Sequence, residues 1–188
     1  MMSCLFSSAQ TSYSDSLIAF HTKYITELFP VIKKDTAFIR FYPVDPSFKF
    51  IAKVEILKAQ KVFNMTTSSG KAKEAQKYAL ISFRYDHKTY RLFAYQLMAL
   101  KNSKEQAGYF FIPFLDKTSH KESYAGGRYM DFEIKDIQNN TLYIDFNKAY
   151  NPYCAFTTGY NCPIPPRENT LPITVRAGER YLSSQFHK

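Results

Sequence analysis

The residues best suited to chemistry gather between Tyr109 and Asn169. A polar loop in this stretch holds His120 and Glu122, which are the candidate acid and base of an enzyme. Cys154 is the candidate nucleophile, because a thiolate is strongly nucleophilic. The serine hydrolase pattern Gly-x-Ser-x-Gly does not occur in the sequence. The stretch therefore indicates where a site would lie and leaves its reaction and cofactor open.

An arginine that follows two glycines is the candidate anchor for a charged ligand. Gly126 and Gly127 allow positive φ and a close approach of the backbone. Arg128 could present its planar guanidinium to a carboxylate or a phosphate. The spacing is not that of a P-loop or of a dinucleotide fingerprint. In the alternative, Arg128 pairs with an internal acid such as Asp131 or Asp145 and has a structural role.

Two cysteines, Cys154 and Cys162, stand in a proline-rich segment and allow three interpretations. In an exported protein they would form a disulfide that closes a short loop. They could instead be buried free thiols, of which one is reactive. They could also ligate zinc, but zinc usually takes four ligands and only His120 stands nearby in the sequence. We rank the disulfide or buried pair first and predict no metal site.

Two segments with a period of two, Tyr129–Ile134 and Thr141–Lys148, predict a hairpin around Asn139 and Asn140. Side chains alternate between the two faces of a strand, so this hairpin has one apolar and one polar face. The apolar face holds Met130, Phe132, Ile134, Leu142, Ile144 and Phe146. The polar face holds Tyr129, Asp131, Glu133, Tyr143, Asp145 and Asn147.

The elements that must position these residues are mostly short strands. Residues 13–29 form one amphipathic helix, which Pro30 is expected to end. A hairpin is predicted across Asp86-His87-Lys88, and Leu171–Ala177 is predicted as the last strand. The pattern predicts a mainly β protein: a single antiparallel barrel or sandwich-like domain of about eight or more strands with an N-terminal helix.

Composition bounds the partners and the location of the chain. The 188 residues carry a net charge of +9, but the basic residues are spread without a long run, so no nucleic-acid partner is expected. No apolar run reaches the roughly 18 residues of a membrane span. Residues 1–10 look like a signal-peptide remnant or a disordered tail, and residues 11–188 form one β-rich domain. We therefore expect a periplasmic or secreted protein, with a cytoplasmic location as the alternative.

Four motifs together resemble a known family. They are Pro113-Phe114-x-Asp116-x-Thr118, Glu122-x-Tyr124-x-Gly126-Gly127-Arg128-Tyr129, Asp145-Phe146-Asn147-x-Ala149-Tyr150-Asn151-Pro152-x-Cys154-Ala155-Phe156 and Cys162-Pro163-x-Pro165-Pro166-x-Glu168-Asn169. The chain resembles the bacterial and archaeal family labelled domain of unknown function 1684, most sharply over residues 109–180. The resemblance carries no established activity. Its pattern includes polar and aromatic residues as well as Gly and Pro, which makes a shared pocket as plausible as a packing role.

Three functions follow from these residues. The first is a pocket built from residues 116–169 that binds a small polar or anionic molecule and is anchored by Arg128. Its ligand-binding residues are Tyr124, Gly126, Gly127, Arg128, Tyr129, Asp145, Asn147, Tyr150 and Asn151. The second is a hydrolase-like or other enzyme that uses the same pocket with Glu122 or His120. The third is a structural protein of the cell envelope with a buried polar network beside the two cysteines. The oligomeric state stays open.

Overall fold

The computed structural model describes residues 5–181, and the side chains of residues 13–181 apart from Lys34. A long helix, α1 (Leu5–Ile32), precedes a β-rich body that includes the short helix α2 (Met98–Lys101). The strands are β1 (Arg40–Phe41), β2 (Lys49–Ile56), β3 (Phe63–Met65), β4 (Lys73–Tyr85), β5 (Lys88–Leu97), β6 (Tyr109–Phe114), β7 (Arg128–Glu133), β8 (Thr141–Asp145) and β9 (Glu179–Arg180). Turns of 3₁₀-helix occupy Lys33–Phe38, Pro46–Phe48, Ile134–Asp136, Phe146–Lys148, Tyr153–Ala155 and Arg167–Asn169.

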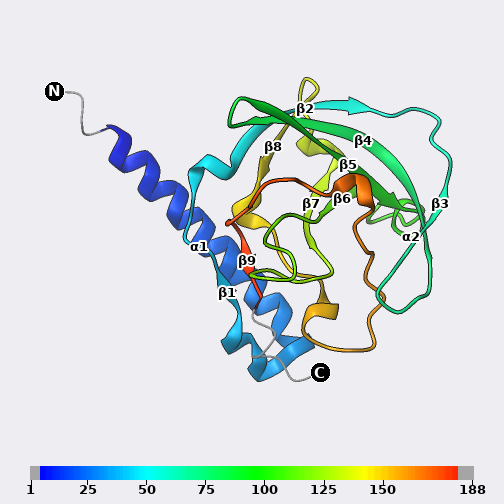
Figure 1. The fold of residues 1–188 in the computed structure, drawn as a ribbon, viewed down its shortest axis with the longest axis horizontal. Coiled ribbons are helices and arrows are strands. Elements are labelled where there is room, and N and C mark those ends of the chain that lie inside the picture. The colour runs from blue at the N-terminus through cyan, green and yellow to red at the C-terminus, as the bar shows by residue number, and fades with distance from the viewer. Residues whose placement is uncertain (1–4, 182–188) are drawn as a thin grey trace.

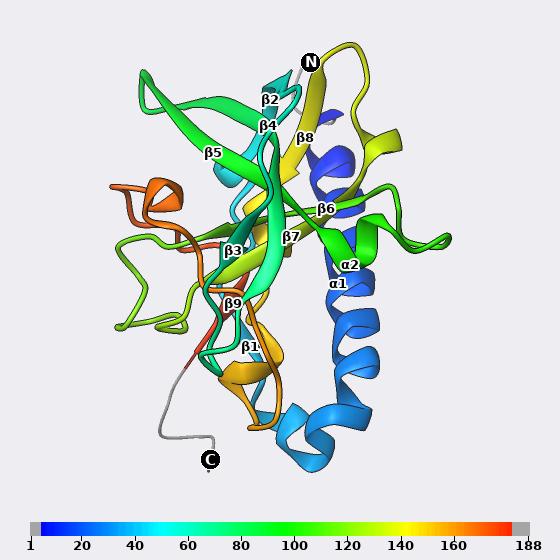
Figure 2. The same cartoon turned by 90° about the vertical axis from the view of Figure 1, so that its right-hand side faces the viewer.

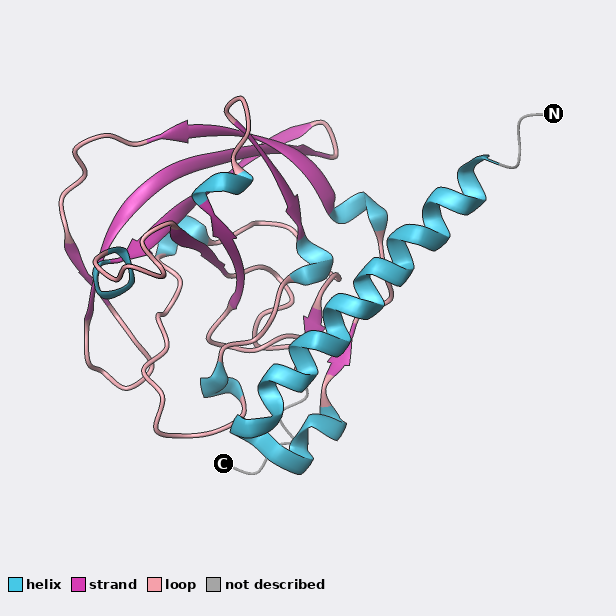
Figure 3. Ribbon diagram, turned by 180° about the vertical axis from the view of Figure 1, so that it is seen from behind, coloured by secondary structure: helices cyan, strands magenta, loops and turns pink. Residues whose placement is uncertain are grey.

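The strands form a curled half-barrel of antiparallel pairs, which confirms the predicted fold class (Figure 1). The main sheet has seven strands in the order β7-β6-β5-β4-β2-β8, with β3 paired to β4, and β1 pairs with β9 in a separate ribbon. Apolar side chains such as Ile81, Phe110 and Ile144 fill the concave side. The helix α1 runs along the outside of this body (Figure 2), and its N-terminal turns extend past the sheet (Figure 3).

The helix is longer than the sequence predicted. It begins at Leu5, and it continues through Pro30 to Ile32. Pro30 stands in the last turn, where only two further helical residues follow, and Leu28 and Ile32 on either side of it are buried against the body. Tertiary packing thus outweighs the single hydrogen bond that proline removes. No helix in the described part of the chain is long and apolar enough to cross a membrane.

Residues 1–4 of the predicted signal remnant or tail lie outside the described residues. Residues 5–10 form the first turns of α1. Neither observation tests the signal-peptide interpretation, which stays a prediction.

The hairpin predicted across Asp86-His87-Lys88 is confirmed, whereas the hairpin predicted between Tyr129–Ile134 and Thr141–Lys148 is wrong. Strands β4 and β5 meet at a two-residue turn in which Asp86 and His87 both have positive φ, 47° and 57°, as the commonest tight hairpins require. In contrast, β7 pairs with β6 and β8 pairs with β2, at opposite ends of the strand order. The chain leaves β7 in the 3₁₀ turn Ile134–Asp136, where Asp136 accepts from the backbone N–H of Glu133 at 2.8 Å. That turn redirects the chain before the two segments can pair.

The predicted last strand, Leu171–Ala177, is also wrong. The carbonyls of Val175 and Ala177 accept hydrogen bonds from the guanidinium of Arg128 instead of from a neighbouring strand. The apolar side chains of this segment are buried, which explains its strand-like pattern. The final strand of the described chain is β9, which pairs with β1.

Candidate functional site

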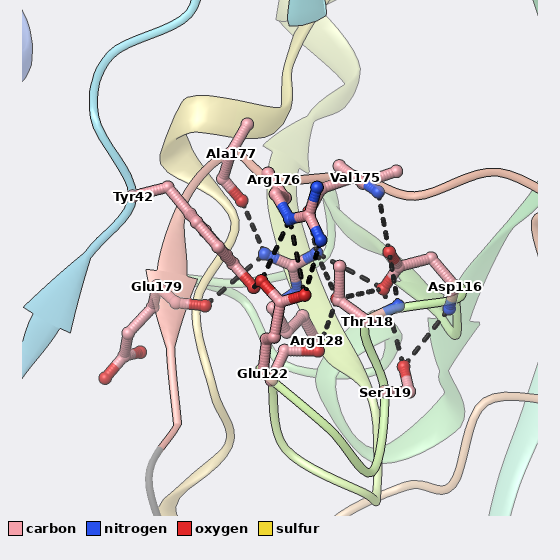
Figure 4. A network of polar contacts seen from close by, with 11 residues as sticks. Tyr42, Asp116, Thr118, Ser119, Glu122, Arg128, Val175, Arg176, Ala177 and Glu179 are labelled. Atoms are coloured by element: carbon pink, nitrogen blue, oxygen red, sulfur yellow. Dashed lines mark hydrogen bonds and ion pairs between the residues drawn. The ribbon is translucent and has the colours of Figure 1, made fainter.

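Arg128 lies at the centre of a buried polar network (Figure 4). Its side chain is 1% exposed and forms an ion pair with Asp116, with 3.3 Å between Nη2 and Oδ1. Nη2 also donates to the carbonyl of Val175 at 2.8 Å, and Nη1 donates to the carbonyls of Ala177 and Glu179. Asp116 in turn accepts from the backbone N–H of Val175 at 2.7 Å. The expected role of Arg128 as the anchor of an open anion pocket does not fit this geometry, because its partners are internal.

The two glycines before Arg128 are explained by packing. Gly127 has φ +84°, and a Cβ atom there would lie 2.5 Å from the Pro165 side chain and 2.7 Å from the carbonyl of Phe114. At Gly126 a Cβ atom would meet the ring of Tyr124. Both positions therefore need glycine to let the chain pass its neighbours, without any ligand.

The two expected acid–base residues, Glu122 and His120, lie at the surface in the polar loop between β6 and β7. Glu122 forms an ion pair with Arg176 at 2.8 Å, and hydrogen bonding from that guanidinium lowers the pKa of Glu122. His120 is exposed in a turn with φ 70°. The structure does not bring either side chain to a cavity.

Asp145 and Asn147 join helix α1 to the body. The hydroxyl of Tyr13 on α1 donates to Oδ2 of Asp145 at 2.8 Å. Asn147 is buried; its side chain donates to the carbonyl of Asp45 at 2.9 Å and accepts from the N–H of Asp45 at 2.9 Å. The ring of His21 lies 2.9 Å from the carbonyl of Asn147. These polar residues position the helix.

A groove of about 1130 Å³ lies between α1 and the outer faces of β6, β7 and β8. Of the predicted ligand-binding residues, Tyr129, Asp145 and Tyr150 line it, and Cys162 lies at its edge. Its walls are unusually aromatic: Phe20, Tyr24, Tyr109, Phe111, Tyr129, Phe132, Tyr143, Tyr150, Tyr153 and Tyr160. This groove is the candidate functional site.

Asp131 is the carboxylate around which the groove is arranged. Tyr109 donates to its Oδ1 at 2.8 Å, and Tyr150 donates to its Oδ2 at 2.6 Å. Asp131 is exposed and lines the groove, and desolvation by the neighbouring groups raises its pKa. Burial also raises the pKa of Tyr109 and of Tyr150 well above the usual value, so both hydroxyls stay protonated and donate.

The sheet register explains how these residues meet. Phe111 on β6 lies directly opposite Asp131 on β7, and Tyr109 stands two residues before Phe111 on the same face. Tyr129 shares that face with Asp131, and its backbone pairs with that of Tyr150 in an isolated bridge. The result is a row of rings around one carboxylate.

A second carboxylate, Glu179, lies under α1 behind this row. Glu179 is fully buried, and its Oε2 accepts from the hydroxyl of Tyr24 at 2.8 Å and from the N–H of Asn151 at 2.7 Å. Burial raises the pKa of Glu179 to about 8. The ring centroids of Tyr24 and Tyr150 are 5.6 Å apart, so Tyr24 connects this buried acid to the aromatic wall of the groove.

Cys154 and Cys162 are joined by a disulfide, which is the first of the three interpretations that the sequence allowed. The hydroxyl of Tyr124 donates to the carbonyl of Cys154 at 3.1 Å, so Tyr124 holds the disulfide loop to the body. A disulfide-bonded sulfur is not a thiolate, so the nucleophile role of Cys154 does not fit this arrangement.

Comparison with protein families shows to which family this chain belongs. Residues 35–180 match the family described as protein of unknown function (DUF1684). The chain belongs to this family. The DUF1684 protein also resembles an uncharacterised protein of Haloarcula marismortui solved by solution NMR, with 27% identity and a TM-score of 0.68. That likeness covers 92% of this chain and 96% of the other. A comparison with curated proteins gives no match.

The family match covers the sheet side of the groove but not its helix. In this DUF1684 protein, α1 precedes residue 35, so Tyr24 and the rest of the helical wall lie outside the matched segment. Sequence reasoning placed Asp131 on a polar face but missed Tyr109, Tyr24 and Glu179 as members of the site. The alternation of Tyr109 and Phe111 along an aromatic strand was a usable signal for Tyr109. No local sequence pattern indicates that Tyr24 and Glu179 belong to the site.

Proposed function

We propose that this DUF1684 protein binds a small polar molecule in the groove between α1 and strands β6, β7 and β8. The observation that carries the proposal is the Asp131 carboxylate, which two tyrosine hydroxyls hold at 2.8 and 2.6 Å inside an aromatic groove. Small-molecule sites combine mostly apolar or aromatic walls with a few fixed polar groups, in clefts of roughly 300–1,000 Å³. The groove, at about 1130 Å³, has this character and is open enough for a ligand to enter.

The proposal predicts binding that depends on Tyr150 and Asp131. We expect at least one probe among N-acetylglucosamine, succinate and ethanolamine to shift the ring NMR signals of Tyr109 and Tyr150. Tyr150→Ala removes one wall and one donor to Asp131, so it should weaken that binding about tenfold or more, which corresponds to about 1.4 kcal/mol. Isothermal titration calorimetry measures the loss.

The matched control is Tyr90→Ala, a tyrosine of β5 that does not line the groove. It should leave the affinity unchanged. Signals that shift only at tyrosines away from the groove, or equal affinity in the Tyr150→Ala variant, would contradict the proposal.

An enzymatic role of the same groove is a second candidate. The raised pKa of Asp131 supports it, because general acids are often carboxyls whose pKa is raised by burial. Asp131 then replaces Glu122 and His120 in the acid–base role that the sequence predicted. Turnover of a bound compound that Asp131→Asn abolishes, with binding retained, separates catalysis from binding alone.

A structural role in the cell envelope is a third candidate. The Arg128–Asp116 network and the Cys154–Cys162 disulfide support it, since both hold distant parts of the chain together, although Cys162 also belongs to the groove lining. This role is compatible with binding, because the network and the groove occupy opposite faces of β7.

We further propose that the protein is exported. The disulfide supports this location, because disulfides persist mainly in oxidising compartments. Protein isolated from its host without reductant and alkylated after denaturation should show Cys154 and Cys162 protected from alkylation. Mass spectrometry reports this and the mature N-terminus together. Alkylation of both residues would contradict the disulfide and remove this support for export.

A further inference from the structure

We infer that the groove binds a small organic ammonium ion, with its charged nitrogen beside Asp131 and its carbon substituents against the tyrosine rings. The inference rests on the proposed binding function and names the chemical class of its ligand. Three features support it: a carboxylate without an ion-pair partner among the described residues, a row of neighbouring aromatic rings, and tyrosine hydroxyls that orient the carboxylate.

The charge of Asp131 has no cationic partner in the part of the chain that the structure describes. The ion pairs there join Lys23 to Glu27, Lys77 to Glu168, Arg128 to Asp116, Lys135 to Glu133 and Arg176 to Glu122. Four lysines belong to the groove lining: Lys23 and Lys135 are paired with other carboxylates, and neither Lys73 nor Lys148 forms an ion pair with Asp131. Asp131 is exposed, so its carboxylate is accessible to a cation that enters the groove. A cationic ligand would supply the partner that the described residues do not.

The rings near Asp131 form a continuous surface. The ring centroid of Tyr129 lies 5.9 Å from that of Tyr150 and 5.5 Å from that of Phe111. Tyr109 stacks beside Phe111 at 6.3 Å with an interplanar angle of 11°. The face of an aromatic ring carries a negative potential and attracts cations within about 6 Å, most strongly when the cation is desolvated. Quaternary and other alkylated ammonium ions fit such a surface because their substituents are apolar.

Anionic and neutral ligands fit this arrangement less well. An anion placed beside Asp131 would meet like charge. A sugar could stack on the rings and donate to Asp131, but it would leave the negative charge uncompensated. The position of the carboxylate within the row of rings therefore favours a cation.

The test uses choline and its neutral isostere 3,3-dimethyl-1-butanol with the full-length protein. The two molecules share their shape and differ in the charge of the central atom. We expect choline to shift the ring signals of Tyr109, Tyr129 and Tyr150, and to bind at least tenfold more tightly than the isostere in isothermal titration calorimetry. Equal affinity for the two compounds would overturn the ammonium inference, because charge would then contribute nothing.

Two variants locate the effect. Asp131→Asn keeps the size of the side chain and removes its charge, so it should reduce choline affinity at least tenfold while circular dichroism stays unchanged. Glu55→Gln removes an exposed carboxylate of β2 that lies outside the groove lining and forms none of the ion pairs named above, so it should bind choline as the unmodified protein does. If both variants weaken choline equally, the effect is general electrostatics and the inference fails. The comparison of choline with its isostere needs no variant and holds even if Asp131→Asn does not fold.

The complete set of probes also distinguishes the binding proposal from the ammonium inference. If choline fails while N-acetylglucosamine or succinate shifts the groove tyrosines, the ammonium inference falls and the binding function stands. If no probe shifts those tyrosines, both fall.

Discussion

Replacing Arg128 with methionine should lower the free energy of unfolding by about 3–5 kcal/mol, as expected when one partner of a buried ion pair is removed. The substitution keeps an apolar stem of similar length but leaves the Asp116 carboxylate, whose side chain is 0% exposed, without its cation. The carbonyls of Val175 and Ala177 lose their donors at the same time. Because these carbonyls belong to a segment with no partner strand, the loss should also loosen the chain that leads to β9.

Urea unfolding followed by circular dichroism measures this effect. The matched control is Arg176→Met, which removes the arginine of an exposed ion pair with Glu122 and should hardly move the unfolding midpoint. A midpoint for Arg128→Met close to that of the control would contradict the structural role of Arg128. If Arg128 instead bound a ligand, that ligand would raise the unfolding midpoint of the unmodified protein. The network geometry predicts no such effect, because the partners of Arg128 are internal.

The separation of Arg128 from the groove follows from strand geometry that the sequence already contained. Arg128 and Tyr129 are neighbours on one strand, so their side chains point to opposite faces. Arg128 therefore shares the inner face with Met130, while Tyr129 shares the outer face with Asp131. The strand predicted from the sequence began at Tyr129, whereas the observed strand begins at Arg128, which places the two side chains on opposite faces. The fold class, by contrast, was predictable, because it depends on turn spacing and alternation rather than on which strands pair.

Other parts of the groove depend on contacts that no local pattern encodes. Tyr109 reaches Asp131 only because β6 and β7 pair in one register, and Tyr24 reaches Glu179 only because α1 docks beside β9. Their separation in the chain is 22 residues in the first case and 155 in the second. The expected β7–β8 hairpin failed for the same reason: the asparagine turn was recognised, but the redirecting turn at Ile134–Asp136 was not. The faces of these strands were assigned correctly in the main, since Met130, Leu142 and Ile144 are buried whereas Asp131 and Tyr143 are exposed.

Glu179 should make the stability of this protein fall as pH rises. Burial raises its pKa in the folded state from 4.5 to about 8, so the folded chain holds this proton more tightly than the unfolded chain. Its contribution to stability is fully present below about pH 4.5. It declines as the unfolded chain loses the proton, and the decline is complete once pH passes the folded pKa of about 8. At about 1.4 kcal/mol per pKa unit, the loss across this window amounts to several kcal/mol.

Glu179→Gln removes the titrating group while keeping an oxygen to accept from Tyr24 and from the N–H of Asn151. The variant should therefore be more stable than the unmodified protein near pH 8, and its stability should vary less between about pH 5 and pH 8. Urea unfolding at several pH values in this window measures both effects. Glu122→Gln is the control, because the pKa of Glu122 is lowered by Arg176 and its contribution is lost only on acidification below the usual glutamate pKa. If Glu179→Gln keeps the same pH dependence as the unmodified protein, Glu179 does not hold a proton in this pH window, and Tyr24 and Asn151 donate to an ionised carboxylate instead.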